Sequence, residues 1–156
     1  MKRDRELVRT AVTTDGMAIQ YASPQLRNDA KLADAAVNQN SMALSFLSAA
    51  LRDNRDLALT AVRQDGLALQ HVSERLQDER EIVLAAVERN GAALRFASAD
   101  RRSDHEVVLT AVRSTGLMLR YASSQLRNDL EIVKAVSNRT HGRCSTPLRR
   151  CGGTRK

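Results

Sequence analysis

The sequence predicts an all-α protein, an α-solenoid of five and a half 25-residue repeats with two helices in each. Three observations support this fold class: apolar positions recur every 25 residues, aromatic residues are scarce, and every copy contains helix-terminus signals. The array is expected to span residues 4–136. Its repeats are expected at 4–28, 29–53, 54–78, 79–103 and 104–128, followed by a partial copy at 129–136.

The recurrence is clearest at an alanine that is followed by valine in every full copy. The alanines are Ala11, Ala36, Ala61, Ala86 and Ala111. Glycine or serine stands five residues after each alanine, and isoleucine or leucine three residues after that. A fixed period of this length is the signature of a solenoid, in which each repeat is one small unit stacked on the next.

The composition is typical of short, closely packed helices. Apolar residues make up 42% of the chain, but aromatic residues only 3%, and Trp is absent. The core must therefore be built mainly from Leu, Val, Ile and Ala. A β-sandwich uses more β-branched and aromatic residues, and 7 Gly with 2 Pro are too few to separate its many strands.

The longer helix, equivalent to residues 4–14, is expected to begin at a polar N-cap residue. The candidate N-caps are Asn28, Asp53, Asp78, Ser103 and Asn128. In three copies a glutamate stands three residues later and would reach back to the cap amide, as in a capping box. These acids are Glu81, Glu106 and Glu131. Leu7, Val8 and Ala11 share one helix face, and Gly16 is expected to end the helix in a left-handed conformation.

The shorter helix, equivalent to residues 17–23, has apolar residues at positions 18, 19, 21, 22 and 26. Neither helix would be stable alone, because isolated helices need about 12–15 residues even in favourable cases. Stacking of the repeats must therefore supply the stability. A serine column follows this helix, and we expect it to cap helix ends or form turns. Its members are Ser23, Ser48, Ser73, Ser98 and Ser123.

The charge is divided unevenly between the array and the C-terminal segment. Residues 1–136 contain 19 Lys or Arg and 18 Asp or Glu, a net charge of +1, whereas residues 137–156 contain six basic residues and no acid. Clustered basic residues are what phosphate backbones require. Nucleic-acid binding is therefore not expected of the array, although the tail, expected to be disordered, could bind nucleic acid or acidic surfaces.

Both cysteines, Cys144 and Cys151, lie in the tail. An array without cysteine has no disulfide framework, which is typical of reducing compartments. The N-terminus has no signal-peptide pattern, and no apolar run approaches the roughly 18 residues of a membrane span. The sequence thus predicts an intracellular protein, cytoplasmic by default, with no membrane association.

One recurring string is most complete from Asp78 to Ser98 and is joined by the segment from Ser123 to Asp129. These residues resemble the helical repeats catalogued as domain of unknown function 4116, over about residues 4–136. The resemblance implies a stacked helical array and brings no known activity or site residues. One departure is Arg101, which stands where the other copies have leucine.

No residue pattern predicts an enzyme, and no cofactor is expected. The serine column has no His or acid beside it in the manner of a catalytic triad. His71 replaces an aromatic residue and is expected to be packed and hydrogen-bonded, while His105 should be solvated. A metal site at His141, Cys144 and Cys151 is disfavoured because it lacks a fourth ligand and a Cys-x-x-Cys pair.

The sequence therefore predicts a non-enzymatic scaffold that binds another protein, whose identity it does not give. The candidate binding column changes from copy to copy: Gln20, Ser45, Gln70, Arg95 and Arg120. An equal rival lies on the first helix: Thr13, Asn38, Arg63, Glu88 and Arg113. Leu59, Leu84 and Leu109 are expected in the core, or on an apolar stripe if exposed. An RNA-binding array aided by the tail is the alternative function, and ends without polar caps suggest self-association.

Overall fold

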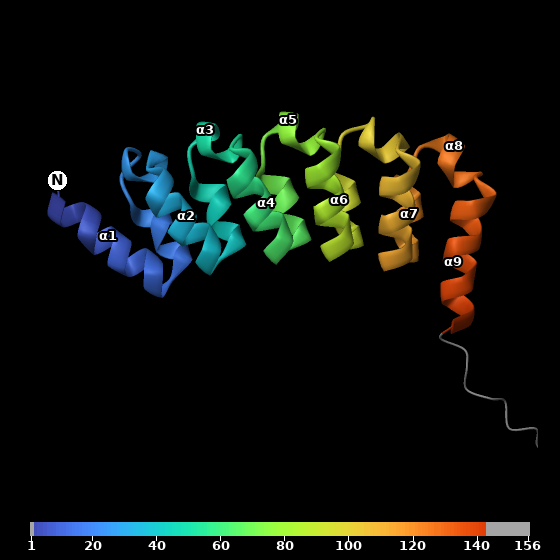
Figure 1. Ribbon diagram of the computed structural model, residues 1–156, viewed down its shortest axis with the longest axis horizontal. Coiled ribbons are helices and arrows are strands. Elements are labelled where there is room, and N and C mark those ends of the chain that lie inside the picture. Colours follow the sequence, from blue (N-terminus) through green and yellow to red (C-terminus); the bar gives the residue numbers. More distant parts are fainter. Residues whose placement is uncertain (1, 143–156) are drawn as a thin grey trace, which may run out of the picture.

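The computed structural model describes residues 2–142 of the chain, and the side chains of residues 4–138. All regular elements in this part are helical. Figure 1 shows the copies following one another along the long axis, so that the first and fifth lie far apart. The most extensive contacts are all within one copy or between consecutive copies. The predicted all-α solenoid is therefore confirmed.

Each full repeat contains three helical segments, not the two that the sequence predicts. The long α-helices are α1 (Lys2–Thr14), α2 (Ala30–Gln39), α4 (Arg55–Gln64), α6 (Arg80–Arg89), α7 (His105–Ser114) and α9 (Leu130–Gly142). The second segments are the 3-10 helices η1 (Gly16–Tyr21), η3 (Ser41–Phe46), η4 (Gly66–His71), η5 (Gly91–Phe96) and η7 (Gly116–Tyr121). The third are single turns: η2 (Leu26–Asn28), α3 (Ala49–Arg52), α5 (Glu74–Gln77), η6 (Arg101–Ser103) and α8 (Ser124–Arg127).

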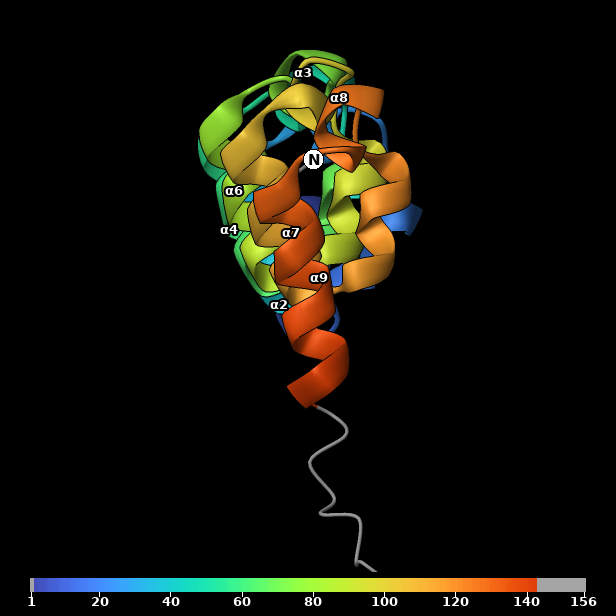
Figure 2. The same cartoon turned by 90° about the vertical axis from the view of Figure 1, so that its right-hand side faces the viewer.

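The three kinds of segment form separate layers along the stack. Seen end-on in Figure 2, the long helices lie on one side, the 3-10 helices on the other, and the single turns cross the top. The predicted shorter α-helix at positions 17–23 is thus a six-residue 3-10 helix. Its three-residue turn aligns side chains three apart, and in η3 this buries Ser41 and Leu44 together.

Each long helix from α2 onward begins one residue later than predicted, because two polar residues stand in succession before it. Asp29, Asn54 and Asp104 are the N-caps, and each accepts hydrogen bonds from two amides of the first turn. Glu79 occupies the same position without a side-chain cap bond. The predicted N-caps Asn28, Asp53, Asp78, Ser103 and Asn128 are therefore wrong by one position; Asp53 and Asp78, for example, end the preceding single turns.

The glycine column does not end the long helices in a left-handed conformation, because no described residue has a positive φ. Asp65, for example, ends α4 in an extended conformation with φ −140°, and its side chain accepts from Leu67 N at 2.9 Å. The glycine is required for a different reason. A Cβ on Gly91 would lie 2.5 Å from the carbonyl oxygen of Ala111 in the next long helix.

The core is one continuous seam along the stack. Ala36, Ala61, Ala86 and Ala111 are all 0% exposed, so each long helix presents the small side chain of alanine to the core. Leu69 and Leu94 of the 3-10 helices are equally buried. Full burial of such a leucine contributes on the order of 2 kcal/mol. Stacking therefore supplies the stability that the short helices lack.

The terminal copies lack a neighbour on one side, and their seam positions are uncovered. Leu7 is 69% exposed, whereas its equivalents Leu32 and Ile82 are 2% and 0% exposed. The other exposed large apolar side chains of the described residues are Tyr21, Leu117, Leu130 and Val133. All five lie in the first or the last two copies.

Two local predictions need correction or completion. Helix α9 runs through Gly142, past the boundary predicted at residue 136; the remainder of the predicted tail, with Cys144 and Cys151, lies outside the described residues. Arg101 replaces the core leucine with ion pairs, to Asp78 at 3.3 Å and to Asp104 at 3.6 Å.

The close approach at the glycine column can be tested by substitution. Gly91→Ala should destabilise the protein by about 1–3 kcal/mol, the usual cost of overpacking a tight contact. Gly116→Ala is the matched control, because its Cβ would meet only Val136 Cγ1 at 3.2 Å. We expect the control to change stability by less than about 0.5 kcal/mol. Urea unfolding measures both; equal losses would contradict the proposed role of the glycine.

Candidate binding surface

The predicted binding column lies on the 3-10 helices and is only partly available. Gln20 and Ser45 are half-buried, and Ser45 Oγ donates to the carbonyl of Met42 at 2.8 Å. Gln70, Arg95 and Arg120 are exposed. The Arg95 guanidinium stacks 4.4 Å from the Phe96 ring centroid, and that of Arg120 lies 5.1 Å from the centre of Tyr121. The column is therefore interrupted in its N-terminal half.

Three clefts lie on the opposite side, each between two consecutive long helices. The first, of about 580 Å³, is lined by Arg5, Glu6, Arg9, Thr13, Lys31, Leu32 and Ala35. The second, of about 500 Å³, is lined by Arg63, Glu81, Leu84, Ala85, Glu88 and Arg89. The third, of about 510 Å³, is lined by Leu109, Arg113, Glu131, Lys134, Ala135 and Asn138. Corresponding repeat positions line all three, so they are versions of one groove.

The rival column of the sequence analysis lines these grooves. Thr13, Arg63, Glu88 and Arg113 are exposed and form cleft walls, and Asn38 is exposed at the equivalent position. Of the three leucines predicted in the core, one lies in the core and two line clefts. Leu59 is buried, whereas Leu84 and Leu109 are half-buried and line the second and third clefts. The grooves thus combine an apolar floor with charged walls.

A ladder of ion pairs joins the first turns of consecutive long helices. Arg55 pairs with Glu79 at 2.5 Å and with Glu81. In the next seam Arg80 pairs with Asp104 at 2.9 Å and with Glu106. His105 continues the ladder, with Nε2 3.4 Å from Glu131. Glu81 and Glu106 therefore bind arginines of the preceding repeat and do not form the predicted capping boxes.

The ladder raises the pKa of its two arginines and lowers the pKa of Asp104. The hydrogen bond from Arg55 to Glu79 raises the pKa of the arginine, and the Asp104 bond does the same for Arg80. Burial tends to raise the pKa of Asp104, but the bonds from Arg80 and from two backbone amides outweigh it and the pKa is lowered. These side chains remain charged, and their mutual contacts fix the orientation of the cleft walls.

The serine column both caps the single turns and links consecutive copies. Ser48 Oγ accepts from Leu51 N at 3.4 Å and donates to Asn28 Oδ1 at 2.6 Å in the preceding copy. Ser98 makes the equivalent bond to Asp78 at 2.5 Å. Hydrogen bonds from Ser73 and Ser98 lower the pKa of Asp53 and Asp78 respectively. The predicted capping role is confirmed; the link between repeats was not predicted.

His71 is packed, but the predicted hydrogen bond of its side chain is not found among the described residues. The side chain is half-buried, and its buried Nε2 has no hydrogen-bond partner among the described residues. Burial lowers the pKa of His71, and the nearby Arg52 lowers it further. The residue thus occupies an aromatic position with an unsatisfied nitrogen.

Among the described residues, no group of three or more His, Cys, Asp or Glu side chains could hold a metal ion. The disfavoured metal set cannot be placed, because Cys144 and Cys151 lie outside these residues, as does the side chain of His141. None of the helices in residues 2–142 is long and apolar enough to cross a membrane.

The stacked copies, the seam and the grooves define an all-α helical-repeat protein. The chain belongs to the family described as "Domain of unknown function (DUF4116)", whose family model matches residues 4–52, 54–101 and 104–138. Each full match spans two of the 25-residue copies. Neither a curated protein nor a solved structure matches the chain. The predicted resemblance is confirmed, and the family description assigns no activity.

The unsatisfied His71 predicts a distinct pH dependence of stability. Because the folded pKa lies below the ordinary 6.5, the unfolded chain binds the proton first, and stability should fall as the pH drops through 6.5. Asp53 and Asp78 have a folded pKa below 3.8; their contribution is present above 3.8 and is lost only at lower pH. His71→Phe should add about 1 kcal/mol at pH 7 by removing the unpaired nitrogen.

Urea unfolding between pH 7 and pH 5 measures this difference. The wild-type free energy of unfolding should decrease over that range, and that of His71→Phe should stay more nearly constant. His105→Phe controls for the loss of a half-exposed imidazole from the ladder. Parallel curves for wild type and His71→Phe would contradict the assignment.

Proposed function

We propose that the array is a non-enzymatic scaffold that binds a protein partner, as an extended segment laid across the grooves between the long helices. The observation that supports this most is the repetition of one cleft along the stack with different walls in each copy. A fixed frame with a variable lining is what recognition of a particular polypeptide requires. Solenoids commonly use such extended faces for binding.

The chemistry of the grooves favours protein over RNA. The second cleft contains Arg63 and Arg89 but also Glu81 and Glu88, so its walls are balanced in charge. A phosphate backbone would meet carboxylates there, which disfavours binding. Leu84 and Leu109 offer apolar contact to side chains. The cysteine-free array also suits a reducing, intracellular compartment.

The groove is favoured over the predicted 3-10 column because its side chains are free to make new contacts. Ser45 is hydrogen-bonded within its own turn, and Arg95 stacks on the neighbouring ring. Arg63, Glu88 and Arg113 are exposed on cleft walls. The column Gln20, Ser45, Gln70, Arg95 and Arg120 remains the competing surface, and one experiment separates the two.

Affinity capture from cell extract should compare the wild-type chain with two triple variants. The groove variant carries Arg63→Ala, Glu88→Ala and Arg113→Ala; the column variant carries Gln70→Ala, Arg95→Ala and Arg120→Ala. All six side chains are exposed, so both variants should fold, as circular dichroism can verify. We expect a protein retained by the wild type and the column variant to be lost from the groove variant.

Other outcomes of the capture are equally informative. Loss from the column variant alone would move the binding surface to the 3-10 helices. Retention that depends on intact RNA, shown by ribonuclease treatment, would favour the nucleic-acid alternative and contradict a protein-binding scaffold.

Self-association is a second candidate, favoured by the uncovered seam positions Leu7 and Val133. A second copy could cover these side chains as neighbouring repeats cover their equivalents. Leu7→Lys should therefore reduce concentration-dependent association, measured by size exclusion with light scattering. Thr13→Lys introduces a lysine on the groove face of the same helix and should leave the association unchanged. A wild-type monomer at all concentrations would exclude this candidate.

A further inference from the structure

The ion-pair ladder is incomplete between α1 and α2, where the arginine pairs with one acid instead of two. In the seams that follow α4 and α6, one arginine is held by two acids of the next repeat. Arg5 occupies the equivalent position before α2 and pairs with Asp29 at 2.5 Å. The position of the second acid is taken by Lys31. The other full or partial copies have an acid at this position: Glu6, Asp56, Glu81, Glu106 and Glu131.

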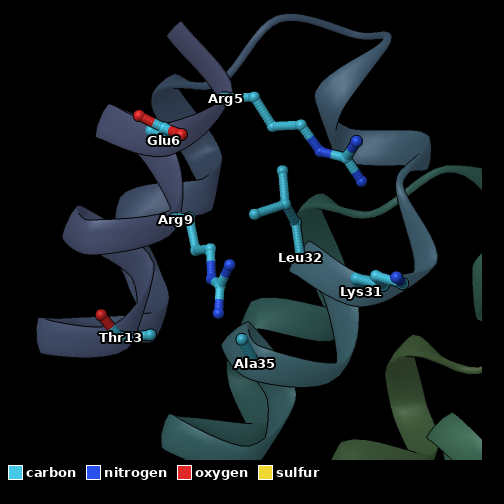
Figure 3. A pocket seen from close by; sticks show the side chains of 7 residues that line it. All are labelled: Arg5, Glu6, Arg9, Thr13, Lys31, Leu32 and Ala35. Atoms are coloured by element: carbon cyan, nitrogen blue, oxygen red, sulfur yellow. The ribbon is translucent and has the colours of Figure 1, made fainter. Parts of the chain in front are cut away.

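This substitution leaves an excess of positive charge in the first cleft. Arg5, Arg9 and Lys31 line it, and Glu6 is the single acid among its lining residues. Both carboxylate oxygens of Asp29 already have partners, since one caps α2 and the other binds Arg5. Arg9 and Lys31 have no ion pair among the described residues. In Figure 3, Arg5 and Arg9 extend from α1 toward α2, and Lys31 lies at the rim.

We propose that the cleft between α1 and α2 binds an acidic side chain of the partner segment, which takes the place that the Glu81 carboxylate fills beside Arg55. The Arg5 guanidinium, oriented by Asp29, and the cations of Arg9 and Lys31 are its ligands. Charge-assisted bonds of this kind are shorter and stronger than neutral ones. The cleft volume of about 580 Å³ accommodates the side chain with part of its backbone.

The inference deepens the proposed function by naming the chemistry that one groove selects. The second cleft could not select the same group, because Glu81 and Glu88 line it. The equivalents of Arg9 in the middle of the array are Leu59, Leu84 and Leu109. An acidic residue of the partner would therefore be directed to the first cleft, and apolar residues to the later ones.

Hexaglutamate, a probe that does not depend on identifying the partner, tests the proposal with the full-length chain. Its binding is followed by amide chemical shifts, which distinguish the cleft from the basic C-terminal segment. We expect saturable shifts at Arg9, Lys31 and Leu32. Lys31→Glu should weaken this site by about tenfold or more, because it removes a charged ligand and restores the internal acid.

Two matched variants make the result specific. Lys134→Glu changes the net charge by the same amount in the third cleft, and the affinity of the first cleft should not change. Glu81→Lys leaves Arg55 with Glu79 alone, and it should create new hexaglutamate-dependent shifts between α4 and α6. Equal weakening by Lys31→Glu and Lys134→Glu, or shifts confined to residues outside α1 and α2, would overturn the proposal.

The outcome can be separated from that of the capture experiment. If hexaglutamate binds as described but no protein depends on the groove residues, the anion site stands and the scaffold function fails. If capture of a protein requires Arg63, Glu88 and Arg113 but Lys31→Glu does not change the affinity for hexaglutamate, the scaffold function stands and the acidic-group assignment fails.

Discussion

The spacing of the whole stack depends on the close approach of each 3-10 helix to the long helix of the next copy. At Gly16, Gly66 and Gly91 a Cβ would collide with the backbone carbonyl of the alanine twenty residues later. These alanines are completely buried. A small residue on each side lets two backbones meet in van der Waals contact, and the larger side chains on both sides of this line then interdigitate.

The contact between consecutive copies differs where the glycine or the alanine of this close approach is replaced by another residue. Ser41 replaces glycine between α2 and α4, and these two helices have the least extensive contact of any consecutive long pair in the described chain. At the C-terminal seam Val136 replaces the alanine, and Gly116 has no backbone atom within reach of its Cβ position. Local spacing therefore follows the volume of one or two side chains, as close packing requires.

Polar contacts set the register of the stack more than its stability. Backbone bonds such as Ser73 N to Arg52 O, at 3.1 Å, join consecutive copies along the edge formed by the single turns. The arginines of the ladder are about half exposed, and exposed pairs contribute only about 0–1 kcal/mol each. The ladder can consequently lose members, as it does at Ala30 and Lys31, without loss of the fold. This tolerance lets the cleft walls differ from copy to copy.

The sequence predicts the core better than the polar layer because burial repeats strictly whereas pairing does not. The alanine and leucine columns follow from the period alone. The predicted N-caps lie one residue before the observed ones because two good N-cap residues stand side by side, as in Asn28 and Asp29 or in Asp53 and Asn54. The sequence does not show that the first residue of each pair belongs to the preceding single turn. Asx-Gly is a local signal for a left-handed residue, but glycine is required at position 91 because of a close contact with a residue twenty positions later in the sequence. The clefts depend on side chains 20 or more residues apart, and arginine recurs at the ladder position too irregularly to reveal them.

Separate control of the seam and of the cleft walls has a consequence for recognition. Exposed wall residues such as Arg63, Glu88 and Arg113 lie outside the buried core, so substitutions there change the chemistry of one groove and leave the spacing intact. The grooves also differ in a fixed order: the first is basic, whereas the second is balanced in charge. Binding in one cleft holds adjacent parts of an extended partner near the next, which raises their effective concentration there. A stack of individually weak grooves can thus select both the sequence and the direction of the segment that it binds.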